Sequence, residues 1–354
     1  MVTYDAAVVG GSVAGSACAI ELARRGLRVA LFEKQRFPRP KACGEGLLPH
    51  GVEALRALGI PFDAPRVRGR RFVAPSGATA EADFPSGRGL VVRRERFDET
   101  LFRAAASTPG VDAFEGRAWD GEPARWIVGA DGLRSQFHRR PEFPAASPAL
   151  RRVGLSTHAV GLDVDRDRVE VILHEQGEIY LAPSDGDEAL VACLFRELPR
   201  GEDPVTETLL SLDVLRGRIR GLKLTTPVLA CAPLGLRVGA VAAGNVLLVG
   251  DAAGAPDPIT GEGMSLALLS ARAAAEAVAA GDTTSYVREH RRLSAGSDWL
   301  GRWLLRATHY PAIANRVVGS LAERPELFAK LLEIATGARP PGDFTLAEKA
   351  RLIV

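Results

Sequence analysis

Residues 5–33 read DAAVVGGSVAGSACAIELARRGLRVALFE and carry the clearest indication of the fold in the sequence. A short apolar run ends at Val9, a glycine-rich turn follows, and apolar residues then recur at helical spacing until Gly26. A second apolar run occupies residues 28–33. A strand, a tight turn, a helix and a strand within about 30 residues form a βαβ unit. The chain therefore contains the half-motif of a Rossmann-type α/β domain.

The glycine-rich turn GGSVAG, residues 10–15, suits a bound pyrophosphate. Glycine has no Cβ to obstruct the phosphates, and the next helix offers free N–H groups and its positive dipole end. Ser12 stands where glycine is usual, and its side chain leaves less space for the pyrophosphate next to the backbone. Glu33 ends the second strand, where an acid can accept hydrogen bonds from both hydroxyls of an unphosphorylated adenosine ribose. The alternative is that the glycines only pack the helix against the sheet and that Glu33 is a solvated strand end.

Two more glycine motifs lie further along the chain. The first is RWIVGADGLRS, residues 125–135, with Asp131 at the tip of an expected strand. The second is NVLLVGDAAGAPDPITGEGMSLAL, residues 245–268, in which Asp251 ends a strand and can accept a hydrogen bond from a ribityl or ribose hydroxyl. Gly263 then begins a helix whose N–H groups can face an electron-rich ring edge. Both motifs offer further contacts for a nucleotide cofactor.

Together the three motifs resemble those of the FAD-dependent oxidoreductases of the para-hydroxybenzoate hydroxylase fold, in the branch that contains geranylgeranyl reductases and flavin-dependent halogenases. The resemblance implies one FAD, with residues 258–263 beside its isoalloxazine ring and the loop KACGEGL, residues 41–47, over it. NAD(P)H is the implied electron donor and would bind transiently, because no second glycine fingerprint is present. The residues that the resemblance implies for FAD are Gly10, Ser12, Val13, Ala14, Gly15, Glu33, Lys34, Arg94, Asp131, Gly250, Asp251, Gly261, Gly263 and Met264.

The resemblance also suggests residues next to the reactive ring. Cys43, Pro258 and Gly261 are the flavin-adjacent candidates for catalysis, and Glu45 and Tyr180 are the candidates for substrate binding. Cys43 either has a chemical role or is inert filler. The six histidines show no metal-ligand spacing, so no metal site is expected. Those on expected strands of the substrate lobe, His158 and His174, either face the pocket or are exposed or locally bonded.

The fold that we expect is α/β: a Rossmann-like FAD-binding domain interrupted by an antiparallel β-sheet substrate domain, with C-terminal helices. Strand-like segments occupy residues 151–160, 168–174, 178–182 and 188–195. The link at residues 108–125 is shorter than is usual in the resembled family, which predicts a more open flavin site. The expected domains are a discontinuous FAD-binding domain (1–150 and 240–282), a substrate-binding β-sheet lobe (151–239) and a C-terminal helical cap (283–354).

Composition and charge exclude several classes of protein. Forty-five basic and forty-three acidic residues leave a net charge of +2, too small for a nucleic-acid-binding surface. The four cysteines form no C-x-x-C pair, and neither an export signal nor an uncharged apolar run of membrane-spanning length is found, so a cytoplasmic protein is expected. Trp and Leu at helical spacing in the cap predict core packing, with contact to a membrane surface as the alternative. The oligomeric state is not predicted.

Two substrate segments of the resembled branch guide the choice of chemistry. The W-x-W-x-I-P segment of the halogenases is missing, and the Y-x-W-x-F-P segment of the prenyl reductases has YLAP, residues 180–183, as its counterpart. We therefore expect an NAD(P)H-linked monooxygenase of secondary metabolism that acts on an aromatic, polyketide or lipid-like small molecule. The alternatives are a flavin-dependent reductase of isoprenoid or other C=C bonds and an FAD-binding module without turnover.

Overall fold

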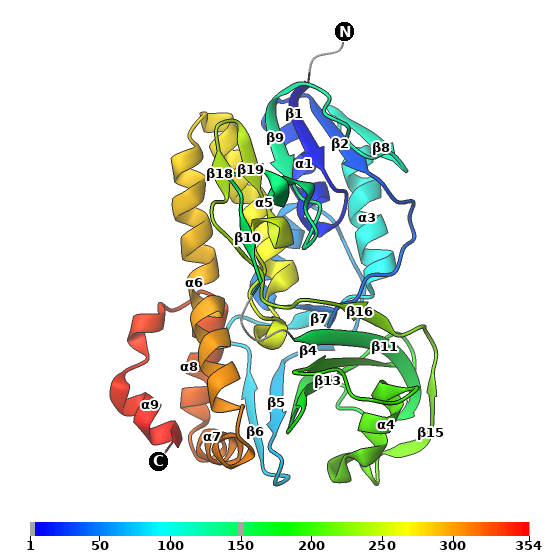
Figure 1. Ribbon diagram of the computed structural model, residues 1–354, viewed down its shortest axis with the longest axis vertical. Coiled ribbons are helices and arrows are strands. Elements are labelled where there is room, and N and C mark those ends of the chain that lie inside the picture. The colour runs from blue at the N-terminus through cyan, green and yellow to red at the C-terminus, as the bar shows by residue number, and fades with distance from the viewer. Residues whose placement is uncertain (1–3, 148–151, 354) are drawn as a thin grey trace.

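The computed structural model describes residues 4–147 and 152–353 of the chain. Figure 1 shows a sheet with its helices at one end of the molecule, a larger sheet at the other end, and the last helices of the chain alongside. This arrangement confirms the predicted α/β fold, in which a largely antiparallel sheet interrupts a Rossmann-like domain. The predicted boundary between residues 150 and 151 lies outside the described residues, and the division into domains stays a prediction.

The first sheet holds the βαβ unit. Its six strands are, in hydrogen-bonding order, β18 (Ala242–Ala243), β19 (Val246–Leu248), β9 (Ala124–Gly129), β1 (Tyr4–Val9), β2 (Val29–Glu33) and β8 (Val111–Glu115). The middle strand, β1, runs parallel to both β2 and β9. Parallel strands of this kind are covered on both faces, which explains why they are continuous apolar runs in the sequence.

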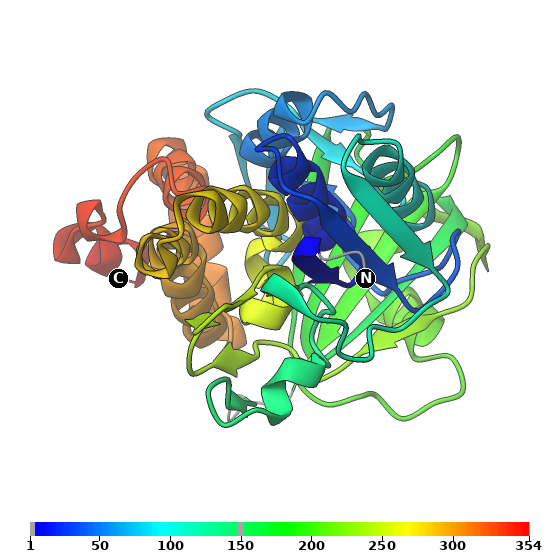
Figure 2. The same cartoon turned by 90° about the horizontal axis from the view of Figure 1, so that it is seen from above.

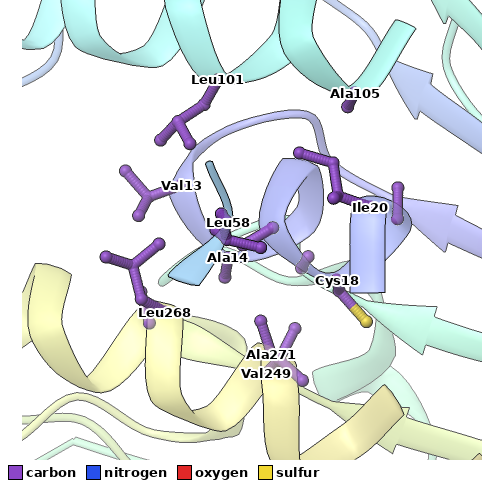
Figure 3. Close-up of a cluster of buried hydrophobic side chains, with 14 of the residues drawn as sticks. Val13, Ala14, Cys18, Ile20, Leu58, Leu101, Ala105, Val249, Leu268 and Ala271 are labelled. Carbon is purple, nitrogen blue, oxygen red and sulfur yellow. The ribbon is translucent and has the colours of Figure 1, made fainter. Parts of the chain in front are cut away.

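Helix α1 (Val13–Ala23) lies between two other helices, α3 (Arg94–Ala106) and α5 (Gly263–Ala280). Figure 3 shows its side chains between Leu101 of α3 on one side and Leu268 of α5 on the other. Most residues of α1 are small and buried, so the neighbouring helices can approach it closely. The helix that follows the glycine-rich turn is therefore fixed in place by packing on both sides.

Helix α5 is also long and apolar enough to cross a membrane, with a mean hydropathy of 1.2 over 18 residues. It is 61% buried, and it packs against α1 and α6 (Thr283–Ala307). Core helices of globular proteins have the same length and composition, so this hydropathy is explained by the position of α5 inside the fold.

The second sheet has eight strands. Seven follow one another in the order β15 (Ile219–Leu224), β11 (Val153–Leu162), β14 (Ala189–Phe195), β13 (Gly177–Pro183), β12 (Arg168–His174), β5 (Gly69–Val73) and β6 (Thr79–Asp83), and β16 (Leu229–Cys231) pairs with β11. All pairings are antiparallel except that of β12 with β5. The four expected strands are present, apart from residue 151, which lies outside the described part of the chain. We did not expect β5 and β6, which come from a segment before the predicted lobe.

The last helices of the chain lie together on one side of the molecule (Figure 2). They are α6, α7 (Pro311–Glu323), α8 (Pro325–Ala335) and α9 (Leu346–Ile353), and two of them, α7 and α8, contact β6. The Trp299 ring on α6 meets Phe344 edge to face, with 5.8 Å between the ring centroids. The apolar stripe of α6 is thus packed inside the protein, as expected for a helical cap.

Short elements complete the described chain. They are β3 (Gly46–Leu47), β4 (Arg66–Val67) and β7 (Gly89–Val91) in a small sheet, the pair β10 (Ala145–Ala146) and β17 (Arg237–Val238), helices α2 (Pro49–Ala57) and α4 (Pro204–Ser211), and the 3-10 turns η1 (Gln136–Arg139), η2 (Asp213–Leu215), η3 (Gly250–Ala253), η4 (Pro258–Thr260) and η5 (Pro341–Asp343).

Candidate functional site

A large cavity lies where the two sheets meet. It has about 1620 Å³ of empty space, part of it open to solvent. Residues of the glycine-rich turn, the 41–47 loop, the second sheet and the 258–263 turn form its wall. The apolar part of the wall includes Leu48, Val67, Phe84, Leu90, Val169 and Leu194.

The glycine-rich turn has the close backbone contacts that its sequence predicts. Gly10 has a φ of 107°, and a Cβ at Gly15 would lie 1.7 Å from the carbonyl oxygen of Gly10. Ser12 is the N-cap of α1, yet its side chain makes no capping bond and donates instead to Asp98, at 2.6 Å. The first N–H groups of α1 therefore keep no side-chain acceptor and can bind an anion.

Glu33 lies beside this turn at the end of β2. One carboxylate oxygen accepts from the Gly11 N–H at 3.0 Å and pairs with Arg39, and the other accepts from the Gln35 N–H at 2.9 Å. A carboxylate oxygen has two lone pairs, so acceptor capacity remains for a ribose hydroxyl. The neighbouring Lys34 is exposed and does not line the cavity.

Arg94 lines the cavity, but its guanidinium is already bound. It forms two hydrogen bonds with Asp98, at 2.8 and 2.9 Å, and a third with Ser12 at 3.0 Å. Burial alone would raise the pKa of Asp98, but the Arg94 charge and its hydrogen bonds outweigh burial and lower that pKa. Arg94 and Asp98 are thus an ion pair that fixes the glycine-rich turn against α3.

The 41–47 loop is attached to both sides of the cavity. The Cys43 N–H donates to the Ser156 hydroxyl of β11 at 3.1 Å, and the Glu45 carboxylate lies 3.0 Å from Nε2 of His158. The other oxygen of Glu45 accepts from the Arg94 N–H at 3.1 Å. His158 is therefore buried and locally bonded, which agrees with one of the two interpretations of its sequence position.

The 258–263 turn forms the opposite wall. The Tyr180 hydroxyl of β13 donates to the Ile259 carbonyl at 3.0 Å, so this residue positions the turn. Burial raises the pKa of Tyr180, which stays neutral. Helix α5 begins at Gly263 without a side-chain cap, and a Cβ added to Gly263 would have no heavy atom within 4 Å. Free N–H groups of α5 are therefore available to a ligand in the cavity.

The carboxylates of the other two motifs differ in their surroundings. Asp251 lines the cavity and lies 3.8 Å from the Lys41 ammonium. Asp131 is at the end of β9 but does not line the cavity; one of its oxygens accepts from the Gln136 N–H, and the other is buried without a hydrogen bond. Of the proposed site residues, those that line the cavity are Ser12, Val13, Ala14, Cys43, Glu45, Arg94, Tyr180, Gly250, Asp251, Pro258, Gly261, Gly263 and Met264.

Several polar residues at the site escaped the sequence analysis. Four of them, Arg39, His50, Arg70 and Arg152, lie outside the glycine motifs, and Glu262 lies inside the 245–268 motif but was given no role; their low exposure in the fold reveals them. In the described ranges no cluster of His, Cys, Asp and Glu could hold a metal ion. The predicted set, by contrast, fits FAD in two ways: a glycine-rich turn and two helix N-termini with free N–H groups.

Comparison with known proteins also indicates an FAD-binding protein. The chain matches a family model described as FAD dependent oxidoreductase over residues 5–146 and one described as FAD binding domain over residues 110–283. It is 28% identical over 360 residues to digeranylgeranylglycerophospholipid reductase 2 of Methanothermobacter thermautotrophicus, covering 93% of this chain and 88% of that protein. It is 28% identical over 326 residues to menaquinone reductase of Mycolicibacterium smegmatis, covering 80% and 78%.

The fold is also shared with solved structures. Flavin-dependent brominase Bmp2 superposes with a TM-score of 0.84 at 20% identity, covering 99% of this chain and 97% of the brominase. Identity this low shows the fold alone. The prediction of an FAD-dependent oxidoreductase is confirmed, and both the monooxygenase interpretation and the isoprenoid reductase alternative are compatible with the relatives. The chain is an FAD-dependent oxidoreductase, and its fold is that of flavin-dependent halogenases and monooxygenases.

Proposed function

We propose that this flavoenzyme reduces a carbon–carbon double bond in the isoprenoid part of a lipid-like molecule, with NAD(P)H as its source of electrons. The observation that carries the proposal is the apolar wall of the cavity, which the uncapped start of α5 also lines. Relatives named as reductases of a geranylgeranyl lipid and of menaquinone match most of the chain and support this chemistry. Their names shift the preference from monooxygenation to reduction.

FAD, when bound, supplies the transfer of two electrons as hydride. The protein holds the cofactor and the substrate in position, provides charged groups and excludes water. The N–H groups at the start of α1 would bind the pyrophosphate, and Glu33 would bind the adenosine ribose. The free N–H groups of α5 would face the electron-rich edge of the ring. The 41–47 loop, held by Ser156 and His158, would exclude water from the ring.

The apolar wall would hold the isoprenoid chain. Leu194 on β14 and Val169 on β12 project from the second sheet into the cavity, and Leu90 and Phe84 extend the apolar surface. An unsaturated chain gains about 25 cal/mol for each Å² of apolar surface that it buries, so an extended prenyl chain gains more here than a small phenol. Since all four cysteines are free thiols, we also propose the reducing cytoplasm as the compartment.

Aromatic monooxygenation is the second candidate. It is favoured by the YLAP segment, residues 180–183, which lacks the Trp and Phe of the prenyl-reductase pattern. The same cofactor and cavity would serve both reactions, and the products differ. Reduction adds two hydrogens to the substrate, whereas monooxygenation adds one oxygen atom.

The test is anaerobic reduction of the FAD-loaded protein by NADPH or NADH, followed by addition of a prenylated quinone, a geranylgeranyl lipid or a phenol, with mass spectrometry of the product. A gain of two hydrogens on a prenylated substrate without oxygen supports the proposal. Leu194→Trp, which fills the apolar wall, should lower this reduction at least tenfold while FAD binding stays unchanged. In a parallel sample to which air is admitted after the reduction, oxygen insertion would show monooxygenation instead. A protein that keeps FAD but turns over none of these substrates is a binding module, and this result contradicts both candidates.

A further inference from the structure

Two ionisable side chains beneath the 258–263 turn have no role in the proposed function so far. Glu262, directly before α5, is 1% exposed, and neither of its carboxylate oxygens has a hydrogen bond. Nε2 of His50, on α2, lies 2.9 Å from Oε2 of Glu262, and Nδ1 of His50 is also buried without a hydrogen bond. Buried polar groups are normally satisfied, so a carboxylate of this kind calls for an explanation.

The charges around the pair are few. Arg70 of β5 is buried and donates to the Thr260 carbonyl at 2.5 Å, and its pKa is lowered by burial, a shift that the Glu262 charge opposes. Asp257, at the other end of the turn, is paired with Arg152. Tyr180 stays neutral and donates to the turn itself. A lone carboxylate in such surroundings is costly to bury. Sharing a proton with His50 removes that cost, and Glu262 and Arg70 line the cavity wall.

The two residues also differ in their access to solvent. The His50 side chain is 17% exposed, whereas the Glu262 side chain is 1% exposed. His50 is therefore the nearer of the two to solvent, while Glu262 belongs to the 258–263 turn that would contact the ring of the cofactor. A histidine with an ordinary pKa near 6.5 changes charge close to neutral pH, so a small change in local potential moves its proton.

We propose that His50 and Glu262 together take up one proton from solvent when the bound FAD accepts two electrons. The electrons come from NAD(P)H or a chemical reductant. The proton binds to a ring nitrogen of His50, and the resulting imidazolium is paired with the Glu262 carboxylate; no covalent bond of the protein is broken. The cause is electrostatic, because added negative charge on the far side of the turn favours the protonated pair. This inference rests on the proposed position of FAD and not on the identity of the substrate.

The first experiment measures how the midpoint potential of the FAD-loaded protein varies with pH, by spectroelectrochemistry over about pH 5–8, a range that brackets the usual histidine pKa. The slope gives the number of protons bound per two electrons. The wild type should bind one proton more than His50→Gln and Glu262→Gln, and the matched control His309→Gln, at an exposed histidine, should equal the wild type. Equal proton numbers in all four proteins would overturn the proposal.

A second measurement needs neither FAD nor substrate. The His50 imidazole is followed by nitrogen NMR during a pH titration of the cofactor-free protein. Loss of the neighbouring carboxylate in Glu262→Gln should weaken proton binding by the His50 imidazole, because the imidazolium loses its paired anion. An unchanged His50 titration would overturn the coupling. Normal proton uptake without double-bond reduction would support the pair and contradict the proposed function, so the two failures are distinguishable.

Discussion

Replacement of Arg152 by methionine tests whether buried charge fixes the wall of the cavity. The Arg152 side chain is 1% exposed and is paired with Glu178, which is also 1% exposed, and with Asp257 at 2.6 Å. It also donates to the Leu194 carbonyl at 3.1 Å. Methionine fills a similar volume but leaves Glu178 buried without a counter-charge. Removal of one partner of a buried pair costs about 3–5 kcal/mol, a large part of the ~5–15 kcal/mol that stabilises a typical protein.

Urea denaturation followed by circular dichroism measures this loss directly. The matched control is Arg216→Met, which breaks a pair whose side chains are 82% and 83% exposed, and it should change the free energy of unfolding by no more than about 0.5 kcal/mol. Adding Glu178→Gln to Arg152→Met should restore part of the stability, because one uncompensated charge is then gone. If Arg152→Met is no less stable than the control, or if the second substitution restores nothing, buried charge does not fix this wall.

Two other substitutions test the cofactor site. Gly15→Ala places a Cβ 1.7 Å from the Gly10 carbonyl oxygen, so the turn must shift. FAD affinity, measured by flavin fluorescence, should then fall at least tenfold. The control Gly319→Ala, in open space on α7, should leave FAD affinity unchanged, and equal affinities of the two variants would contradict the geometric role of the turn. Because Arg94 lowers the pKa of Asp98, the stability from this pair is present above the unfolded-state pKa of about 3.9 and is lost as the pH falls toward the folded-state value. Asp98→Asn should therefore destabilise the protein at neutral pH and weaken this acid dependence in pH-dependent melting, whereas an unchanged acid profile would argue against the pair.

The fold could be predicted from the sequence wherever one local pattern determines one element. The apolar runs of β1 and β2 and the glycine-rich turn between them are of this kind, since a parallel strand buried on both faces has no polar alternation. The strands β5 and β6 lack such a pattern. They carry charged residues such as Arg70, Arg71 and Glu81. The strand β12, with which β5 pairs, lies almost a hundred residues away, so only the completed sheet reveals them.

The residues of the candidate site also differ in whether a local sequence pattern could predict them. Ser12 and Gly263 belong to motifs and could be predicted, because backbone approach to a phosphate or ring demands small residues at fixed spacing. His50 and Glu262 could not, since α2 and the start of α5 are more than 200 residues apart and neither residue type is unusual in its local sequence. Lys34 follows Glu33 in sequence and its side chain is exposed, so its predicted contact with the cofactor stays a prediction.

The contrast between backbone groups in motifs and side chains on strands indicates which part of the cavity determines the reaction. The cofactor side is built from backbone groups of the glycine-rich turn and α5, which can bind the same dinucleotide whatever the substrate. The substrate side is built from strand side chains such as Val169 and Leu194, which can change without disturbing the ladder of main-chain hydrogen bonds. Enzymes of one fold can therefore reduce a double bond or insert oxygen with the same cofactor geometry. The apolar strands, rather than the glycine motifs, are the place to look for substrate choice in this protein.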